Sequence, residues 1–176
     1  MRVVAGTAGG LRLHAPPGRA LRPTSERVRE AVFSSLGSIG AIDGAVVVDL
    51  FAGTGALGIE ALSRGASRAV FVDADPIAVA AVRSNLEATG LSGDGRIVQA
   101  DVVGFLERRT EAFDLAFVDP PYDFQAWDEV LALLDARTAV LETNRALPLG
   151  ARWRTTKQKR YGDTVVTVIA QVRADD

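Results

Sequence analysis

Hydrophobic residues follow two different spacings along residues 45–143. Short continuous apolar runs, most of them ending in an acidic residue, alternate with stretches in which apolar residues recur every three or four positions. Continuous apolar runs of this length are typical of strands buried on both faces, and the second spacing is typical of amphipathic helices. Strands that alternate with helices predict a parallel sheet covered by helices on both sides. The expected strands cover residues 45–51, 66–75, 95–101, 113–119 and 137–143.

The two ends of the chain predict antiparallel structure. RWRTTKQKR and TVVTVIAQV are strand-like runs separated by a turn at Gly162 and Asp163, which predicts a hairpin at one edge of the sheet. Near the start, RVVAG and GLRLHA predict a second, short β-hairpin, and the Pro/Gly-rich APPGRALRP predicts a connector.

The predicted architecture is an α/β fold with a Rossmann-like, doubly wound and mostly parallel sheet. We expect residues 1–22 to form the β-hairpin extension and connector, and residues 23–176 to form one α/β domain. Thr24 is the expected cap of the first helix of this domain. In doubly wound sheets, ligands bind beyond the carboxyl ends of the strands, where the strand order reverses.

The composition excludes several kinds of site. The chain has 176 residues and 48% hydrophobic content, which suits one domain with its own core. It has no cysteine and a single histidine, His14, so we expect no thiolate or histidine metal site and no Ser-His-Asp triad. No apolar run approaches the ~20 residues of a membrane span, and the first residues lack the apolar region of a signal peptide. We therefore expect a cytoplasmic protein, monomeric and without a bound metal.

Positive charge gathers at both ends of the chain, although the net charge is −2. Residues 1–29 contain six arginines and one acidic residue, Glu26, and the segment 152–160 carries five further positive charges. Two basic ends that flank an acidic middle predict a surface that faces a polyanion such as a nucleic acid. The basic residues of the second cluster are Arg152, Arg154, Lys157, Lys159 and Arg160.

A glycine-rich loop, DLFAGTGALG, follows the first expected strand. Gly53, Gly55 and Gly58 match the pattern G-x-G-x-x-G, and Asp73 lies twenty residues beyond Gly53 at the end of the next strand. This spacing is also the fingerprint of dinucleotide-binding proteins. Glycines let a ligand approach the backbone closely, whichever ligand it is. A phosphate-binding P-loop is excluded because no Gly-Lys-Ser/Thr follows.

Asp49, at the end of the first strand, distinguishes between two possible cofactors. A carboxylate there opposes the pyrophosphate of NAD but suits the ammonium and sulfonium groups of S-adenosylmethionine. Asp73 can accept hydrogen bonds from the ribose hydroxyls of either cofactor. Asp101 follows the next strand and either meets the adenine amine or caps the following helix, or does both. Acids at the ends of buried strands need partners, which favours ligand roles for Asp49 and Asp73.

The segment FVDPPYDF (117–124) predicts the reaction. Its two prolines end a strand abruptly and fix the backbone, with Asp119 on the same sheet edge as Asp49. The exocyclic amine of a base is a poor nucleophile because its lone pair is conjugated with the ring. A carboxylate at Asp119 and a backbone carbonyl at Pro120 can accept its two hydrogens and favour a pyramidal nitrogen, and Tyr122 can stack on the flipped base. This predicts a methyltransferase that acts on base amines.

The motifs together resemble a known family. DLFAGTGALG followed by FVDPPY resembles the class I S-adenosylmethionine-dependent methyltransferases that act on exocyclic amines. The start, MRVVAGTAGGLRL with LRPTSERVREAVFSSL, and the ending KRYGDTVVTV are similar to the RsmD family. Members of this family are bacterial enzymes that methylate the N2 amine of guanine-966 in 16S ribosomal RNA. One departure is Tyr122, where family members often have Phe, and this change preserves stacking.

The resemblance implies specific roles for residues of this chain. Asp119, Pro120 and Tyr122 correspond to the catalytic segment, and Arg22 and Thr24 to the mouth of the site. The implied partner is 16S ribosomal RNA, in a 30S subunit or an assembly intermediate, with the basic ends of the chain touching the RNA. The implied cofactor is S-adenosylmethionine, with S-adenosylhomocysteine as product, and the implied methyltransferase domain is residues 23–176. Its cofactor-binding residues are Asp49, Phe51, Gly53, Gly55, Asp73 and Asp101.

Several alternatives remain open from the residues alone. An adenine-N6 methyltransferase of DNA or RNA would use the same Asp-Pro-Pro-Tyr chemistry, although the DNA enzymes usually carry a separate recognition domain. A protein-glutamine methyltransferase typically shows Asn-Pro-Pro-Tyr instead. An NAD-dependent oxidoreductase is opposed by Asp49, and a non-catalytic RNA-binding module would not need both the glycine loop and Asp119. The choice of guanine in ribosomal RNA rests on the resemblance.

Overall fold

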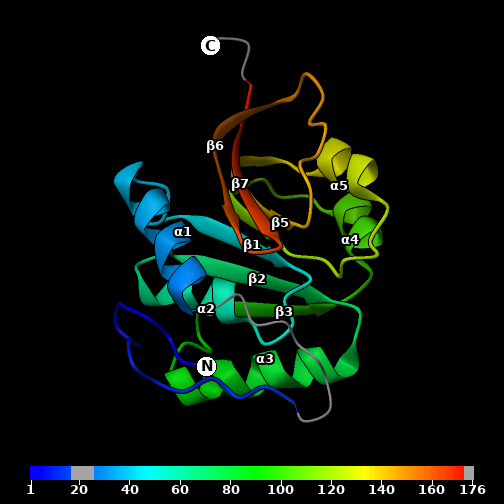
Figure 1. The fold of residues 1–176 in the computed structure, drawn as a ribbon. Coiled ribbons are helices and arrows are strands. Elements are labelled where there is room, and N and C mark those ends of the chain that lie inside the picture. Colours follow the sequence, from blue (N-terminus) through cyan, green and yellow to red (C-terminus); the bar gives the residue numbers. More distant parts are fainter. Residues whose placement is uncertain (17–25, 173–176) are drawn as a thin grey trace.

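A computed structural model describes residues 1–16 and 26–172 of the chain. These residues form a seven-stranded sheet in the order β3-β2-β1-β4-β5-β7-β6, with helices on both faces (Figure 1). The mostly parallel, doubly wound sheet expected from the alternating pattern is confirmed. The strands are β1 (Val46–Leu50), β2 (Arg68–Asp73), β3 (Gly95–Gln99), β4 (Phe113–Val118), β5 (Ala136–Thr143), β6 (Trp153–Tyr161) and β7 (Thr164–Gln171). The helices are α1 (Glu26–Ser38), α2 (Ala56–Ser63), α3 (Pro76–Thr89), α4 (Val102–Arg108) and α5 (Trp127–Leu133).

The strand order reverses beside β1, and this point positions the site. From β1 the chain moves outward to β2 and β3, and then returns to place β4 on the other side of β1. Both neighbours are parallel to β1, with Leu50 opposite Val72 on β2 and Val118 on β4. The glycine loop after β1 and the Asp-Pro-Pro segment after β4 therefore begin at adjacent positions on the carboxyl edge of the sheet.

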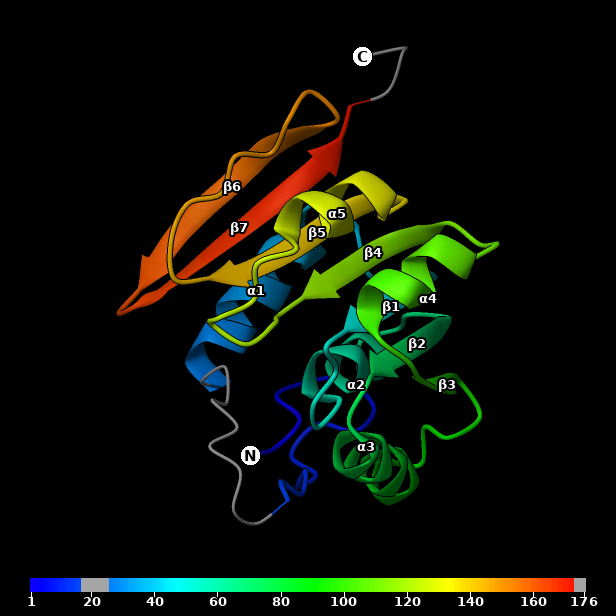
Figure 2. The same ribbon diagram turned by 90° about the vertical axis from the view of Figure 1, so that its right-hand side faces the viewer.

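The predicted C-terminal hairpin is present. β6 and β7 pair in antiparallel orientation around Gly162, whose φ is 59°, and β7 also pairs with β5 (Figure 2). β7 is almost wholly buried, whereas β6 is the edge strand and is exposed from Arg154 to Arg160. A hairpin at this edge leaves a long exposed strand whose side chains can meet a partner.

Two hydrophobic clusters lie on the two faces of the sheet. Helices α1, α2 and α3 cover one face, where Phe33 of α1 contacts Phe117 of β4 with ring centroids 5.4 Å apart. Helices α4 and α5 cover the other face, where Phe105, Val130 and Val48 belong to one buried hydrophobic cluster. The face of α1, α2 and α3 is called the first face below, and the face of α4 and α5 the second.

The first sixteen residues do not form the two regular strands of a hairpin. Antiparallel hydrogen bonds join them around a single bridge between Arg2 and Arg12. The backbone between these two residues instead donates to side chains of α2: the N–H groups of Val4 and Ala5 bind the Glu60 carboxylate at 2.7 and 3.1 Å. Donors used in this way cannot extend a strand ladder. Three apolar side chains fix the segment to the first-face core: Val3, Ala8 and Leu13.

No helix within the described residues is both long and apolar enough to cross a membrane. The expected cap of α1, Thr24, lies outside the described residues, as does Arg22.

Candidate active site

Asp73 fixes the backbone of the glycine loop. One of its carboxylate oxygens accepts the N–H of Gly53 at 2.9 Å, and the other accepts the N–H of Asp75 at 2.9 Å. The loop needs unusual backbone angles: Phe51 has a φ of 61°, while Gly53 and Gly55 have φ of 58° and 77°. Phe51 is the one residue other than glycine with a positive φ in residues 1–16 and 26–172. Such angles in a residue with a Cβ are often found at ligand-binding loops.

Asp49 lies beneath this loop and is 2% exposed. It accepts the N–H of Gly58 at 2.9 Å, in the first turn of α2. Burial raises the pKa of Asp49 to about 7; the hydrogen bond from Gly58 opposes this rise and the nearby charge of Asp73 adds to it. The sequence indicated that Asp49 needs a partner, and Gly58 is one. A positively charged ligand above Asp49 would favour its ionised form, whereas a pyrophosphate would oppose it.

Gly58 brings α2 close to the sheet. A Cβ at this position would lie 2.3 Å from Cε1 of Phe71, so only glycine fits without a shift of the helix. The third glycine of the pattern thus serves packing, and it aligns the N–H that holds Asp49. Gly58 therefore supports the loop by packing against the sheet, whereas Gly53 and Gly55 let a ligand approach the backbone of the loop.

Asp101 caps α4, which is one of its two expected roles. Its carboxylate accepts the N–H of Gly104 at 3.0 Å, and its exposed side chain lies just beyond β3 on the carboxyl edge. Asp75 caps α3 in the same way by accepting the N–H of Ile77 at 2.8 Å. A contact between Asp101 and an adenine stays a prediction.

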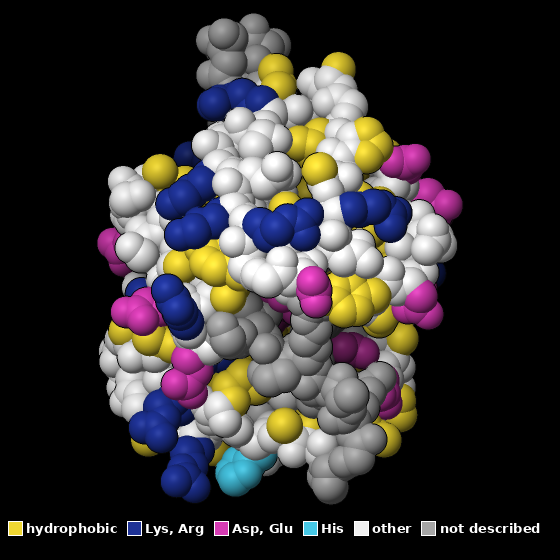
Figure 3. Space-filling view, viewed as in Figure 1, with side chains coloured by type: hydrophobic (Ala, Val, Ile, Leu, Met, Phe, Trp, Pro, Cys, Tyr) yellow, Lys and Arg dark blue, Asp and Glu magenta, His cyan; other side chains and the backbone are white. Residues whose placement is uncertain are grey.

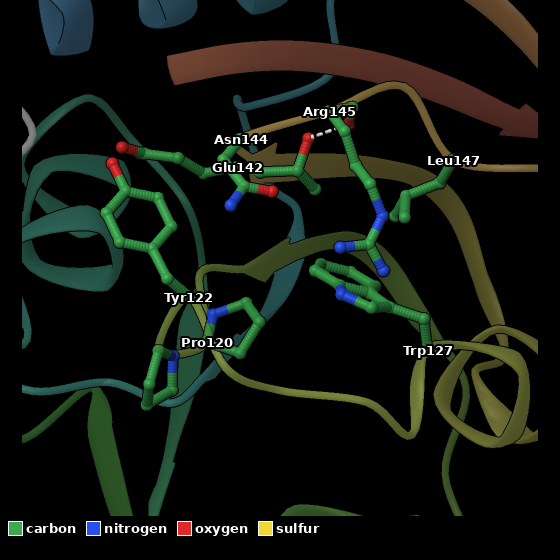
Figure 4. A pocket seen from close by; sticks show the side chains of 9 residues that line it. Pro120, Tyr122, Trp127, Glu142, Asn144, Arg145 and Leu147 are labelled. Atoms are coloured by element: carbon green, nitrogen blue, oxygen red, sulfur yellow. Dashed lines mark hydrogen bonds between the residues drawn. The ribbon is translucent and has the colours of Figure 1, made fainter. Parts of the chain in front are cut away.

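The Pro-Pro-Tyr part of the segment after β4 forms one side of a pocket, whose lining does not include Asp119 (Figure 4). Phe124 lies behind it and packs edge-on against Phe51 of the glycine loop, with ring centroids 5.0 Å apart, and against Trp127, at 5.7 Å. These aromatic contacts tie the segment after β4 to the loop after β1. The pocket is lined on this side by Pro120, Pro121, Tyr122 and Trp127.

The other side of the pocket comes from the end of β5 and the segment after it, which the sequence did not indicate. Glu142, Thr143, Asn144 and Arg145 line it. In Figure 4, Glu142 extends to the same side as the Tyr122 ring, whereas Arg145 extends toward Trp127. A signal was available: these residues end the strand expected over 137–143, and carboxyl ends of parallel strands share one edge.

The basic residues of β6 divide between the two faces of the sheet. The strand has a bulge between Thr155 and Lys157, after which Lys157 pairs with Val168 and Lys159 with Val166, while Arg154 pairs with Ala170. Because Val166 and Val168 face α1, the side chains of Arg154, Lys157 and Lys159 lie on the first face. Lys157 donates to the Ser35 hydroxyl of α1 at 2.6 Å, which agrees with this side.

Arg152 and Arg160 lie toward the second face. Arg152 donates to the carbonyl oxygen of Ala132 in α5, and Arg160 pairs with Val165, one position out of phase with Lys159. The structure thus brings three of the five predicted cations together and separates two. Lysine and arginine side chains form a band across the face seen in Figure 3, above a lower region where acidic groups also occur.

Arg29 was counted with the basic N-terminal residues, but it is not part of a charged surface. It is 1% exposed and its Nε lies 3.7 Å from the equally buried Glu60. Burial lowers the pKa of Arg29, while the charge of Glu60 acts in the opposite direction. The pair fastens the N-terminal segment to α2, since Glu60 also accepts two of that segment's N–H groups.

Comparison with known proteins gives consistent matches over most of the chain. A family model described as "Conserved hypothetical protein 95" matches residues 1–170. A protein of Escherichia coli named "Ribosomal RNA small subunit methyltransferase D" is 37% identical over 135 residues, 77% of this chain and 67% of that protein. A solved structure of an Escherichia coli protein superposes with a TM-score of 0.86 at 32% identity, covering 97% of each chain. A hypothetical protein of Thermus thermophilus superposes with a TM-score of 0.84 at 33% identity, covering 98% of this chain and 99% of that one.

Proposed function

Because the chain belongs to the family whose model spans residues 1–170, the RsmD family expected from its sequence, we propose that it methylates the N2 amine of guanine-966 in 16S ribosomal RNA. S-adenosylmethionine is the methyl donor. The name of the Escherichia coli relative supports ribosomal RNA of the small subunit as the substrate. The observation that carries the proposal is the pairing of β1 with β4, which starts the glycine loop and the Asp-Pro-Pro-Tyr segment at one edge of the sheet.

The residues around the glycine loop fit this cofactor. A buried carboxyl with a pKa raised to about 7 is stabilised as a carboxylate by a nearby cation, so Asp49 favours a ligand with an ammonium or sulfonium group. When bound, S-adenosylmethionine supplies an electrophilic methyl group. Asp73 is held in place by the N–H groups it accepts and directs its remaining lone pairs to ribose hydroxyls. The other residues of this cofactor site are Phe51, Gly53, Gly55 and Asp101.

The segment after β4 prepares the amine. Asp119 accepts one hydrogen of the amine and the carbonyl of Pro120 accepts the other, which favours a pyramidal nitrogen with its lone pair directed at the methyl group. Tyr122, whose side chain is 48% exposed at the pocket, stacks on the base after it leaves its helix. With the donor bound, formation of the N–C bond would break the sulfonium–methyl bond and leave S-adenosylhomocysteine. The amine nitrogen would then be acidic, and Asp119 or solvent would accept its proton. Because the backbone fixes these groups in advance, it avoids the ~100-fold loss of reaction rate that a misplacement of ~1 Å can cause.

RNA binding is assigned to the cations on the first face of β6, together with Arg22 and Thr24, which the resemblance to the family implies. We propose that the substrate is the 30S subunit or an assembly intermediate, as the resemblance to the family implies. The protein would act in the cytoplasm as a monomer.

The test uses labelled S-adenosylmethionine with four substrates: 30S subunits that lack the modification, assembly intermediates, naked 16S ribosomal RNA, and duplex DNA. The RNA is digested and the labelled nucleoside identified. We expect N2-methylguanosine from ribosomal substrates. Label in N6-methyladenine would replace the guanine proposal by the adenine alternative, and label in neither would overturn both.

A variant separates chemistry from cofactor binding. Asp119→Ala should abolish turnover and leave the affinity for S-adenosylmethionine nearly unchanged, because Asp119 is assigned to the amine. Asp123→Ala, four residues further on, is the matched control and should retain activity. A large loss of cofactor affinity in Asp119→Ala would assign this carboxylate to the cofactor site instead.

A further inference from the structure

Two carboxylates occupy neighbouring positions at the carboxyl edge of the sheet. The parallel register of β4 and β5 runs through the pair Val118 and Leu141, so Asp119 and Glu142 are the next residues of the two strands. Side chains alternate along a strand, and Phe117 and Val140 belong to the first-face core. Two residues further along each strand, Asp119 and Glu142 therefore follow on that same face. Adjacent strands lie about 4.8 Å apart, so side chains at these two positions are close enough for their carboxyl groups to reach the same purine.

Glu142 also belongs to the pocket that holds the proposed base. It lines the pocket with Pro120 and Tyr122, and its half-buried side chain extends beside the Tyr122 ring (Figure 4). Arg145, the basic residue of the lining, extends to the opposite end, toward Trp127. A base stacked on Tyr122 would therefore have an acceptor of hydrogen bonds at one end of the pocket and donors at the other.

The edges of the two purines differ in the group next to the reacting amine. Guanine has a donor, N1–H, beside its N2 amine, whereas adenine has an acceptor, the N1 lone pair, beside its N6 amine. A carboxylate next to Asp119 can bind N1–H but is repelled by a lone pair. Sites built to hydrogen-bond one group discriminate strongly against an analogue that lacks it, because their own polar groups are then left unpaired.

We propose that Glu142 determines the choice of guanine by accepting the hydrogen of N1 while Asp119 and the Pro120 carbonyl hold the N2 amine. This inference rests on the proposed methylation of an RNA base amine. It gives a physical reason for guanine specificity, which the Asp-Pro-Pro-Tyr segment alone does not supply, since that segment suits the amine of either purine.

The sharpest probe changes N1 and keeps the amine. In 2,6-diaminopurine the N2 amine is retained, but N1 is an acceptor as in adenine. Small-subunit RNA is assembled with guanine or with 2,6-diaminopurine at the target position, and methylation is followed in single-turnover experiments with labelled S-adenosylmethionine. The wild-type protein should prefer guanine by a factor on the order of 10 to 100, the range of one well-placed base contact.

Variants at Glu142 test whether this residue causes the preference for guanine. Glu142→Gln offers an amide that can donate to N1 as well as accept from it, so the preference should fall severalfold toward unity. Glu142→Ala should slow methylation of guanine but not that of 2,6-diaminopurine, because it removes both the acceptor for N1–H and the repulsion of the N1 lone pair. Glu129→Gln, an exposed acid on α5 outside the pocket lining, is the matched control and should keep the wild-type ratio. Cofactor affinity and melting temperature are measured for each variant to exclude misfolding.

The outcomes separate the inference from the proposed function. If Glu142→Gln methylates guanine and keeps the wild-type ratio, Glu142 does not read N1 and the inference is overturned while the proposed function stands. If the wild-type protein labels no guanine in any ribosomal substrate, the proposed function is wrong and the inference is wrong with it.

Discussion

Asn85 joins the N-terminal segment to the glycine loop. Its Nδ2 donates to the carbonyl oxygen of Thr54 at 2.9 Å and to that of His14 at 3.0 Å, while its Oδ1 accepts the N–H of His14 at 2.8 Å. The side chain is fully buried on α3, among residues that are otherwise mainly apolar. The amide thus holds the residue between Gly53 and Gly55 on one side and the end of the N-terminal segment on the other.

Replacing Asn85 by Leu should loosen both partners. The substitution keeps the branched shape of the side chain but removes its hydrogen bonds. The carbonyl oxygen of the buried residue Thr54 loses a donor, at a cost of about 1–3 kcal/mol, and the exposed residue His14 loses both of its backbone contacts with Asn85. We expect a lower melting temperature and weaker binding of S-adenosylmethionine, measured by thermal unfolding and calorimetry. The neighbouring exposed Ser84→Ala is the control and should change neither. An unchanged cofactor affinity in a destabilised Asn85→Leu protein would mean that the loop keeps its shape without this contact.

Asp49 should make cofactor binding depend on pH. Its pKa is raised to about 7 in the protein without ligand, so the group is mostly protonated below that value. A cationic ligand favours the carboxylate, and binding below pH 7 must therefore release a proton. We expect the affinity for S-adenosylmethionine to rise between about pH 5.5 and 7.5, with proton release visible by calorimetry in buffers of different ionisation enthalpy. Asp49→Asn should bind weakly and lose this dependence, whereas Asp94→Asn, in the loop before β3, should retain it.

The same shift affects stability, with the opposite trend. An acid whose pKa is raised on folding binds more protons in the folded state than in the unfolded state between the ordinary value of 3.8 and about 7. In that interval its contribution to the free energy of unfolding falls as pH rises, and it levels off above 7. Asp49→Asn should remove this contribution, so the difference in stability between variant and wild type should widen in favour of the variant from about pH 4 to 7. A constant difference across the interval in chemical denaturation would contradict the raised pKa.

Gly58→Ala should damage the site through packing alone. The residue is helical, so no backbone strain is involved, but the new Cβ would lie 2.3 Å from the Phe71 ring. Relief requires a shift of α2, at a cost of about 1–3 kcal/mol, and moves the N–H that binds Asp49. We expect both a lower melting temperature and weaker cofactor binding. Gly37→Ala is the matched helical control, since nothing lies within 4 Å of its added Cβ, and it should be neutral or slightly stabilising.

The pattern of apolar residues was sufficient to predict the parallel strands and the C-terminal hairpin, because burial on both faces forces continuous apolar runs. The residue types at the end of the third strand also predicted that Asp101 can cap a helix, since a cap depends on residues close in sequence. The parallel direction of the strands explains the prediction that the glycine loop and the Asp-Pro-Pro segment share one edge. Parallel strands necessarily end on the same side of their sheet.

Contacts between distant segments were not predictable in this way. Arg29 looked like one of several surface arginines, and only the packing of α1 on α2 shows that it is buried against Glu60. Glu142 could not be placed beside Asp119 without the pairing of β4 with β5, which periodicity does not encode. The bulge in β6 is equally invisible in the sequence, yet it decides which cations share a face.

That bulge allows a specific prediction for RNA binding. Without it, Arg154 and Lys157, three residues apart, would point to opposite faces of the strand. With it, Arg154, Lys157 and Lys159 lie on the first face, the face of Asp49. Arg154→Glu and Lys159→Glu, each made as a single variant, should therefore weaken binding of small-subunit RNA. The slope of log affinity against log salt concentration should fall by about one for each phosphate that the variant no longer neutralises.

Arg160→Glu is the matched control for this charge reversal, because it changes the same kind of charge on the same strand but toward the second face. Its effect on affinity and on the salt slope should be clearly smaller than that of either first-face variant. Binding is measured by titration at several potassium chloride concentrations, with the melting temperature of each variant recorded. Equal losses for Arg154→Glu and Arg160→Glu would show that the RNA does not distinguish the two faces, and that β6 contributes only a general positive charge. A loss confined to the first face would place the RNA on the side of the sheet where Asp49 lies, with its target base within reach of the pocket after β4.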